Sequence, residues 1–253
     1  MFTKAIVRVP CKNLVNGITT ANLGKPDYAN AVAQHEQYVE ALKVCGLDVT
    51  ILPPDEEYPD STFVEDTALL TPECAIITNP GASSRRGEVI SIKKVLSEFY
   101  NNIEHVHPPG TVDGGDILAV DDHYYIGLSD RTNLEGARQV MKILENFGKT
   151  ASTVKVKNIL HLKSGIAYLG NRHLVMSSVF QSDSIFKEFT IIRVDEKESY
   201  SANCVHINNS IILPKGFAKA RAMIENAGFP TLEVDVSEFR KLDGGVSCLS
   251  LRF

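Results

Sequence analysis

The chain is organised around its last thirteen residues, Lys241-Leu-Asp-Gly-Gly-Val-Ser-Cys-Leu-Ser-Leu-Arg-Phe253. It alternates apolar with small or polar residues after Asp243-Gly-Gly245, which predicts a strand leaving a tight turn. The strand carries one cysteine, Cys248, near its start. An isolated cysteine is commonly a buried apolar residue, so Cys248 alone indicates no chemistry. Similar turn-then-strand segments recur upstream, however, and each brings a different polar residue to a comparable place.

Composition narrows the class of protein. With 253 residues, 43% hydrophobic and 23% charged, the chain can bury a large core, and we expect a single domain over residues 1–253. No run reaches about eighteen apolar residues, and Lys4 and Arg8 interrupt the first apolar stretch. We therefore expect neither a membrane span nor a signal peptide, and a cytoplasmic location.

Charge and cysteine content exclude further classes. The net charge of −5 and the absence of Lys/Arg clusters argue against nucleic acid as a partner. The five cysteines are an odd number without C-x-x-C spacing, which indicates reduced thiols rather than disulfides or a structural zinc site.

The N-terminal part predicts a strand at residues 5–9, a helix at 31–45 and a strand at 48–52. Between them, residues 11–30 show no sustained period and contain Gly17, Gly24 and Pro26. Loops of this length inside a compact domain are usually lids or binding segments.

From residue 62 onward a strand–strand–helix pattern repeats. First strands are expected at 62–70, 113–120, 161–168, 202–207 and 245–251, and second strands at 75–78, 124–127, 173–176 and 210–213. Helices are expected at 88–99, 133–147, 182–189 and 218–227, and a linking strand at 104–107.

The fifth pass lacks a second strand and a helix, which residues 5–9 and 31–45 would supply. The repeat thus predicts an α/β fold, a five-fold pseudosymmetric propeller whose ring is closed by the N- and C-terminal strands. The alternative is an ordinary open α/β sheet.

In such a ring the polar residues at the starts of the first strands converge on the axis. They are Glu65, Asp66, Asp113, Asp116, His161, Asn203 and Cys248. A cysteine, a histidine and several acids are the ingredients of nucleophilic catalysis beside an anionic pocket.

Six motifs carry a resemblance to a known family. They are Asp60-Ser-Thr-Phe-Val-Glu-Asp66, Ser84-Arg-Arg-Gly87, Asp113-Gly-Gly-Asp116, Gly127-Leu-Ser-Asp-Arg-Thr-Asn133, His161-Leu-Lys163 and Asp243-Gly-Gly-Val-Ser-Cys248. In this order they resemble the dimethylarginine dimethylaminohydrolases of the pentein superfamily, whose fold is a five-fold α/β propeller. The resemblance covers the whole chain.

The resemblance implies a role for each matching residue. Cys248 would be the nucleophile, His161 the general acid/base, and Asp113 the acid that orients the histidine, at a position where some family members carry Glu. The implied substrate-binding residues are Ile18, Asp60, Glu65, Asp66, Arg85, Arg131 and Leu242. Among them Asp66 would contact the guanidinium, the two arginines the α-carboxylate, and the backbone at Ile18 and Leu242 the amino-acid end.

The implied chemistry suits these residue types. A guanidinium carbon is a poor electrophile and requires a thiolate, whose formation the substrate cation can assist. The amine must leave with a proton, which His161 would give before activating water against an S-alkylthiouronium intermediate. The products are citrulline and an alkylamine, and no metal or organic cofactor is expected.

Structural interpretations remain open for several of these residues. Arg85 and Arg131 could flank helix starts on the surface, and Asp113 and Asp116 could serve as turn residues, the role we expect for Asp116. Glu65 could hold a backbone group instead of substrate. His105 and His107 supply only two ligands, so we expect them to be structural.

Rival functions also remain. Arginine or agmatine deiminases and amidinotransferases share the implied fold and nucleophile, but they have His-x-Asp where this chain has His161-Leu-Lys163. A catalytically idle module that binds arginine-like cations is a rival of another class, although it would not need Cys248, His161 and Asp113 together. The expected partner is a small methylated arginine, and the sequence leaves monomer and homodimer open.

Overall fold

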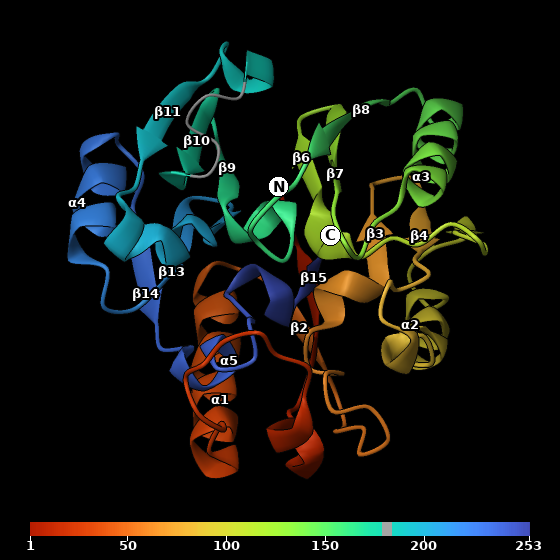
Figure 1. Cartoon of the computed structure of the whole chain (residues 1–253), viewed down its shortest axis with the longest axis horizontal. Coiled ribbons are helices and arrows are strands. Elements are labelled where there is room, and N and C mark those ends of the chain that lie inside the picture. The colour runs from red at the N-terminus through yellow and green to blue at the C-terminus, as the bar shows by residue number, and fades with distance from the viewer. Residues whose placement is uncertain (179–183) are drawn as a thin grey trace.

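Five small sheets surround a central axis in the computed structural model, which describes residues 1–178 and 184–253 (Figure 1). Each sheet has three strands, and the longer helices lie at the periphery. The first strand of each sheet follows a short turn, and these turns contact one another around the axis. The predicted five-fold propeller is confirmed, and the open-sheet alternative is wrong.

Each sheet contains an antiparallel pair and a third strand that runs parallel to the middle one. A parallel neighbour requires a crossover connection, which a helix supplies in four of the sheets. In spatial order the sheets are β3 (Ala68–Leu70), β4 (Ala75–Ile77) and β5 (Ile103–His105); β6 (Ile117–Val120), β7 (His123–Leu128) and β8 (Thr150–Lys155); β9 (Ile166–Gly170), β10 (His173–Met176) and β11 (Thr190–Arg193); β12 (Val205–Ile207), β13 (Ser210–Pro214) and β14 (Thr231–Val234); and β15 (Leu251–Arg252), β1 (Lys4–Arg8) and β2 (Asp48–Leu52).

The crossover helices are α1 (Tyr28–Val44), α2 (Glu88–Leu96), α3 (Leu134–Asn146) and α4 (Ala218–Asn226). The helix α1 begins three residues earlier than predicted because Asp27 caps it, accepting from the Asn30 amide at 2.8 Å. The helix predicted at 182–189 lies partly outside the described residues, and its described part is the 3₁₀ turn Ser184–Phe186. A short helix, α5 (Ser237–Arg240), precedes the C-terminal segment.

The two ends of the chain close the ring. β15 pairs with β1 in antiparallel register, with Ala5 opposite Arg252 and Ile6 opposite Leu251. β1 then pairs with β2 in parallel, so the fifth sheet is assembled from both termini, as predicted. Both chain ends lie near the middle of Figure 1.

The apolar core is divided into five clusters, and each cluster joins two neighbouring sheets. For example, Leu118 of β6 packs in one cluster with Leu174 of β10. No sheet therefore buries its apolar face alone, because each depends on the next one in the ring. Among the described helices, none combines the length and apolar character needed to cross a membrane.

One prediction about the first strands is wrong. Their expected starts are 3₁₀ turns, and strand pairing begins only after them. The turns are η2 (Val64–Thr67), η4 (Gly114–Asp116), η5 (Leu162–Ser164), η8 (Glu196–Ala202) and η9 (Ser247–Leu249). The polar side chains of these turns bond backbone groups of neighbouring turns, which favours tight turns over extended strand at the axis.

Candidate active site

A ring of polar bonds links the five turns around the axis. Three of its side chains accept hydrogen bonds from amides of the next turn: Asp66 from Gly115 at 2.9 Å, Asp116 from Leu162 at 2.9 Å, and Asn203 from Ser247 at 3.0 Å. Asn203 also donates to the Lys163 carbonyl, and Ser247 donates to Glu65 at 2.8 Å. The ring thus holds the predicted site residues at fixed positions relative to one another.

The histidine and its acid form a buried pair. His161 Nε2 lies 3.0 Å from Asp113 Oδ2, and the other carboxylate oxygen accepts from the Gly81 amide at 2.9 Å. His161 immediately precedes η5, and Asp113 immediately precedes η4. The contact matches the predicted orienting role of Asp113, and the shorter Asp side chain reaches the imidazole.

Electrostatics favour the charged form of this pair. Burial lowers the pKa of His161, but the charges of Asp66, Asp113 and Asp116 and the Asp113 hydrogen bond outweigh it and raise the value to about 9. Burial raises the pKa of Asp113, yet the bond to His161 and the positive charges nearby bring it below its ordinary value. At neutral pH the imidazole is therefore protonated and can act as an acid.

Cys248 lies on η9 at the end of the ring. Its Sγ accepts from the Gly245 amide at 3.4 Å. A Cβ on Gly245 would come within 2.3 Å of Asn203 Oδ1, so this turn requires glycine. Burial, together with the charges of Glu65 and Asp66, raises the pKa of the thiol to about 12. In the free protein the cysteine is therefore a neutral thiol that needs a nearby cation to ionise.

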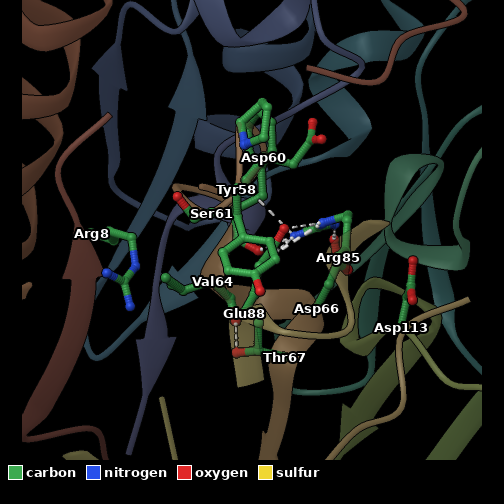
Figure 2. A network of polar contacts seen from close by, with 12 residues as sticks. Arg8, Tyr58, Asp60, Ser61, Val64, Asp66, Thr67, Arg85, Glu88 and Asp113 are labelled. Atoms are coloured by element: carbon green, nitrogen blue, oxygen red, sulfur yellow. Dashed lines mark hydrogen bonds and ion pairs between the residues drawn. The ribbon is translucent and has the colours of Figure 1, made fainter. Parts of the chain in front are cut away.

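Asp66 faces the cavity and is neutralised by a buried arginine. Arg85 Nη1 lies 2.6 Å from Asp66, while Nε and Nη2 bond Glu88 at 3.0 and 2.8 Å (Figure 2). Nη2 also donates to the carbonyls of Phe63 and Asp60. Every nitrogen of this guanidinium is thus engaged by the protein, and Arg85 is a buried structural cation as well as a wall of the cavity.

One cavity collects most of the predicted residues. Its lining includes Ile18, Asp60, Asp66, Arg85, Arg131, His161, Leu242 and Cys248, together with Phe63, Leu160, Asp243 and Gly244. Arg131 makes no side-chain hydrogen bond or ion pair to the described residues, so its guanidinium is available to an anionic group in the cavity. The carboxylate of Asp60 accepts from the Ile18 amide at 3.0 Å and fixes the 11–30 loop at the cavity rim.

Glu65 is predicted to bind substrate, but it does not line this cavity. Its Oε1 meets Lys163 at 2.8 Å and Arg252 at 2.9 Å, and its Oε2 accepts from Ser247. Both oxygens are therefore occupied within the protein. The alternative, in which Glu65 holds protein groups, agrees better with this geometry, although its partners are side chains rather than backbone.

Asp116 has the structural surroundings expected of it. It accepts from the hydroxyls of Ser129 and Thr132 and from the Leu162 amide, and it is fully buried. His105 and His107 stack on each other with ring centroids 6.0 Å apart, away from the cavity.

Asp66, Asp113 and His161 each place one possible metal-ligand atom within 4.8 Å of the others. The same groups already bond Arg85, Gly115, Gly81 and one another. Arg85 brings a positive charge to this place, which disfavours a cation and suits a proton-transfer site better than a metal centre.

Sequence reasoning missed three residues that build the site. Phe63 forms part of the cavity wall, Glu88 pairs with Arg85, and Arg252 pairs with Glu65. Glu88 stands three positions after Arg85 at the start of a predicted helix, a spacing that could have indicated the pair. Arg252 is a charged residue in an otherwise apolar closing strand, which is also a sign of a buried partner.

Comparison with known proteins agrees with these observations. The family model for eukaryotic N,N-dimethylarginine dimethylhydrolase matches residues 23–251. The N(G),N(G)-dimethylarginine dimethylaminohydrolase of Pseudomonas aeruginosa is 51% identical over the full length of both chains.

Two solved structures are similar over the full length of both chains, each at 51% identity. One is a Cys-to-Ser mutant of the Pseudomonas aeruginosa enzyme complexed with citrulline, with a TM-score of 0.99. The other is a His-to-Gly dimethylarginine dimethylaminohydrolase as an adduct with S-methyl-L-thiocitrulline, with a TM-score of 0.98. The resemblance seen in the motifs is therefore confirmed, and the chain belongs to the dimethylarginine dimethylaminohydrolase family.

Proposed function

We propose that the protein hydrolyses Nω-methylated arginines, asymmetric dimethylarginine and monomethylarginine, to citrulline plus dimethylamine or methylamine. The observation that carries this proposal is that Cys248 and His161, which Asp113 orients, line one cavity together with Asp66 and Arg131, and that the Arg131 guanidinium bonds none of the described residues. Full-length identity of 51% to a dimethylarginine dimethylaminohydrolase supports it. The reaction needs no group beyond these side chains and water.

The cavity offers complementary groups to both ends of such a substrate. At the inner end, Asp66 faces Cys248 and His161 and would hold the guanidinium cation by a charged hydrogen bond. At the other end, Arg131 would bind the α-carboxylate, with Arg85 adding positive charge from the wall. Asp60 and the backbone at Ile18 and Leu242 would surround the amino group.

Binding supplies what the free thiol lacks. A guanidinium next to Cys248 adds a positive charge, which lowers the pKa of the thiol from its resting value of about 12. The thiol loses its proton to solvent as the substrate binds, and the thiolate then attacks the guanidinium carbon and forms the C–S bond. The methylated nitrogen takes a proton from the His161 imidazolium and leaves as the neutral amine.

The second half of the reaction uses the same residues in the opposite direction. The neutral imidazole, oriented by Asp113, removes a proton from water, and the resulting hydroxide adds to the thiouronium carbon. Collapse of the adduct expels the Cys248 thiolate, which takes the extra proton of the product to become the resting thiol again, and citrulline is released. The structures of similar enzymes with citrulline and as an adduct with S-methyl-L-thiocitrulline support this course.

The test is to incubate purified protein with asymmetric dimethylarginine and quantify both products. We expect citrulline and dimethylamine in a 1:1 ratio. Release of ammonia from arginine with no reaction of dimethylarginine would refute the proposal and indicate a deiminase instead.

We also propose that the protein is cytoplasmic and is a monomer or a homodimer. The location is supported by the five cysteines, which are all free thiols as a reducing compartment requires.

A further inference from the structure

Lys163 follows the candidate catalytic histidine by two positions, yet it does not line the cavity. Its amine and the Arg252 guanidinium both bond Glu65 Oε1, at 2.8 and 2.9 Å. Glu65 Oε2 bonds the Ser247 hydroxyl, and Asn203 connects Ser247 back to the Lys163 carbonyl. These contacts form a closed loop between the histidine turn and the cysteine turn.

This loop lies next to the nucleophile, because Ser247 directly precedes Cys248. Glu65 and Ser247 are each only 3% exposed, so the charge of Glu65 is held in the interior. A buried anion disfavours the formation of a second anion beside it. The two cations on Glu65 oppose this effect and leave the cluster of Glu65, Lys163 and Arg252 with one excess positive charge.

We propose that Lys163 is an electrostatic positioning residue for the nucleophile: its amine offsets Glu65 behind Cys248 and so favours the attacking thiolate. The proposal rests on the proposed function for the nature of the substrate. The charge arrangement itself does not depend on turnover, so it can be tested on the ligand-free protein.

Ionisable groups reach the thiol from several elements. Burial is the largest influence on the pKa of Cys248, after which Glu65 and Asp66 on η2 raise it and Lys163 on η5 lowers it. The other groups near this position are His161 before η5, Tyr200 on η8, Asp243 at the cavity rim and Arg252 on β15. Lys163 therefore opposes the effect of two acids, and removing its charge should make the Cys248 thiol harder to ionise.

The first measurement is the rate of Cys248 alkylation by iodoacetamide, a neutral reagent, at about pH 8. Because the pKa of the thiol lies well above this pH, the rate is proportional to the thiolate fraction. Lys163→Met should lower the rate about tenfold, equivalent to a rise of about one unit in pKa. Glu65→Gln should raise it by a similar factor, since both cations then lack their anion. The Cys248 peptide is quantified by mass spectrometry, with Cys248→Ser as the blank.

Rescue separates charge from packing. The double variant Lys163→Met/Glu65→Gln loses the contacts but also both charges, and its rate should return to within about threefold of wild type. Lys163→Arg keeps the charge and should remain near wild type. Lys149→Met is the matched control, because it removes a lysine from an ion pair with Asp122 on the outer part of a sheet.

An unchanged rate in Lys163→Met, or changes of the same sign in the two single variants, would overturn the proposal. If circular dichroism shows that Lys163→Met does not fold, the Glu65→Gln variant decides alone, and a lower or unchanged rate would be the contrary result. A wild type that fails to hydrolyse dimethylarginine would refute the proposed function but leave these rate ratios intact.

Discussion

Glu65 and Asp66 are neighbouring, buried carboxylates on one turn, but their side chains point in different directions, Asp66 toward the cavity and Glu65 away from it. Asp66 faces the cavity and shares Arg85 with Glu88. Glu65 faces away from the cavity and holds two cations, Lys163 and Arg252. The comparison shows that position on the ring, rather than residue type, decides which acid can meet a substrate. It also separates reacting groups from the charges that support them.

The largest effect should come from the cavity side. Cys248→Ser should abolish turnover while leaving fold and ligand binding largely intact, because this site cannot ionise a serine hydroxyl. Citrulline formation and binding of a substrate analogue measure the two properties separately. Appreciable citrulline production would exclude Cys248 as the nucleophile.

Removal of the proton donor should have the next largest effect. His161→Gly should lower steady-state turnover by ~10²–10⁴-fold, the usual contribution of a positioned acid/base. Rates are compared at saturating dimethylarginine. A loss of less than about tenfold would mean that another residue transfers the proton.

Substitution of the two cavity arginines should have different effects, on substrate binding for Arg131 and on stability for Arg85. Arg131→Met should raise KM by about ten- to a hundredfold with little change in Tm, because it removes one charged hydrogen bond to the substrate.

Arg85→Met leaves Asp66 and Glu88 buried without their cation, which should lower the free energy of unfolding by about 3–5 kcal/mol. Urea denaturation and steady-state kinetics are the measurements. A stable Arg85→Met variant with only a raised KM would contradict the assignment of Arg85 as a structural cation.

The pH dependence of turnover should report the protonation states of Cys248 and His161. At rest Cys248 is a thiol of pKa about 12 and His161 is an imidazolium of pKa about 9. The attacking state, a thiolate beside an imidazolium, carries one proton fewer than this resting pair. The pair in the free enzyme loses its first proton as the pH rises through about 9. We therefore expect kcat/KM to rise several-fold per pH unit above about pH 7 and to level off near 9. A profile that falls between these values would contradict the assigned protonation states.

The sequence alone predicted the ring and the meeting of Cys248, His161 and Asp113, because turn residues and apolar runs recur at regular spacing. It did not predict the 3₁₀ turns, since a tight turn and a strand start carry the same mixture of polar and apolar residues. The sequence also could not predict that the Glu65 side chain points away from the cavity. On a turn, adjacent side chains diverge, and only contacts with Lys163 and Arg252, distant in sequence, fix which way each points. The strands β8, β11 and β14 were not predicted individually, because their short segments contain few alternating apolar residues.

The Lys163 position bears most directly on the substrate. An acid at this position, as the His-x-Asp pattern would place it, would face the methyl groups of a dimethylated nitrogen without a donor, at a cost of about 1–3 kcal/mol or more. Here the lysine amine bonds Glu65, so no carboxylate reaches the cavity from this position. Free arginine, in turn, lacks a partner for its second terminal nitrogen.

We therefore expect this cavity to prefer methylated arginine, and the decisive measurement is kcat/KM for asymmetric dimethylarginine, monomethylarginine and arginine under one set of conditions. We expect both methylated substrates to exceed arginine by about one to three powers of ten, the discrimination expected from one charged hydrogen bond. Equal values for all three, or a preference for arginine, would contradict the account.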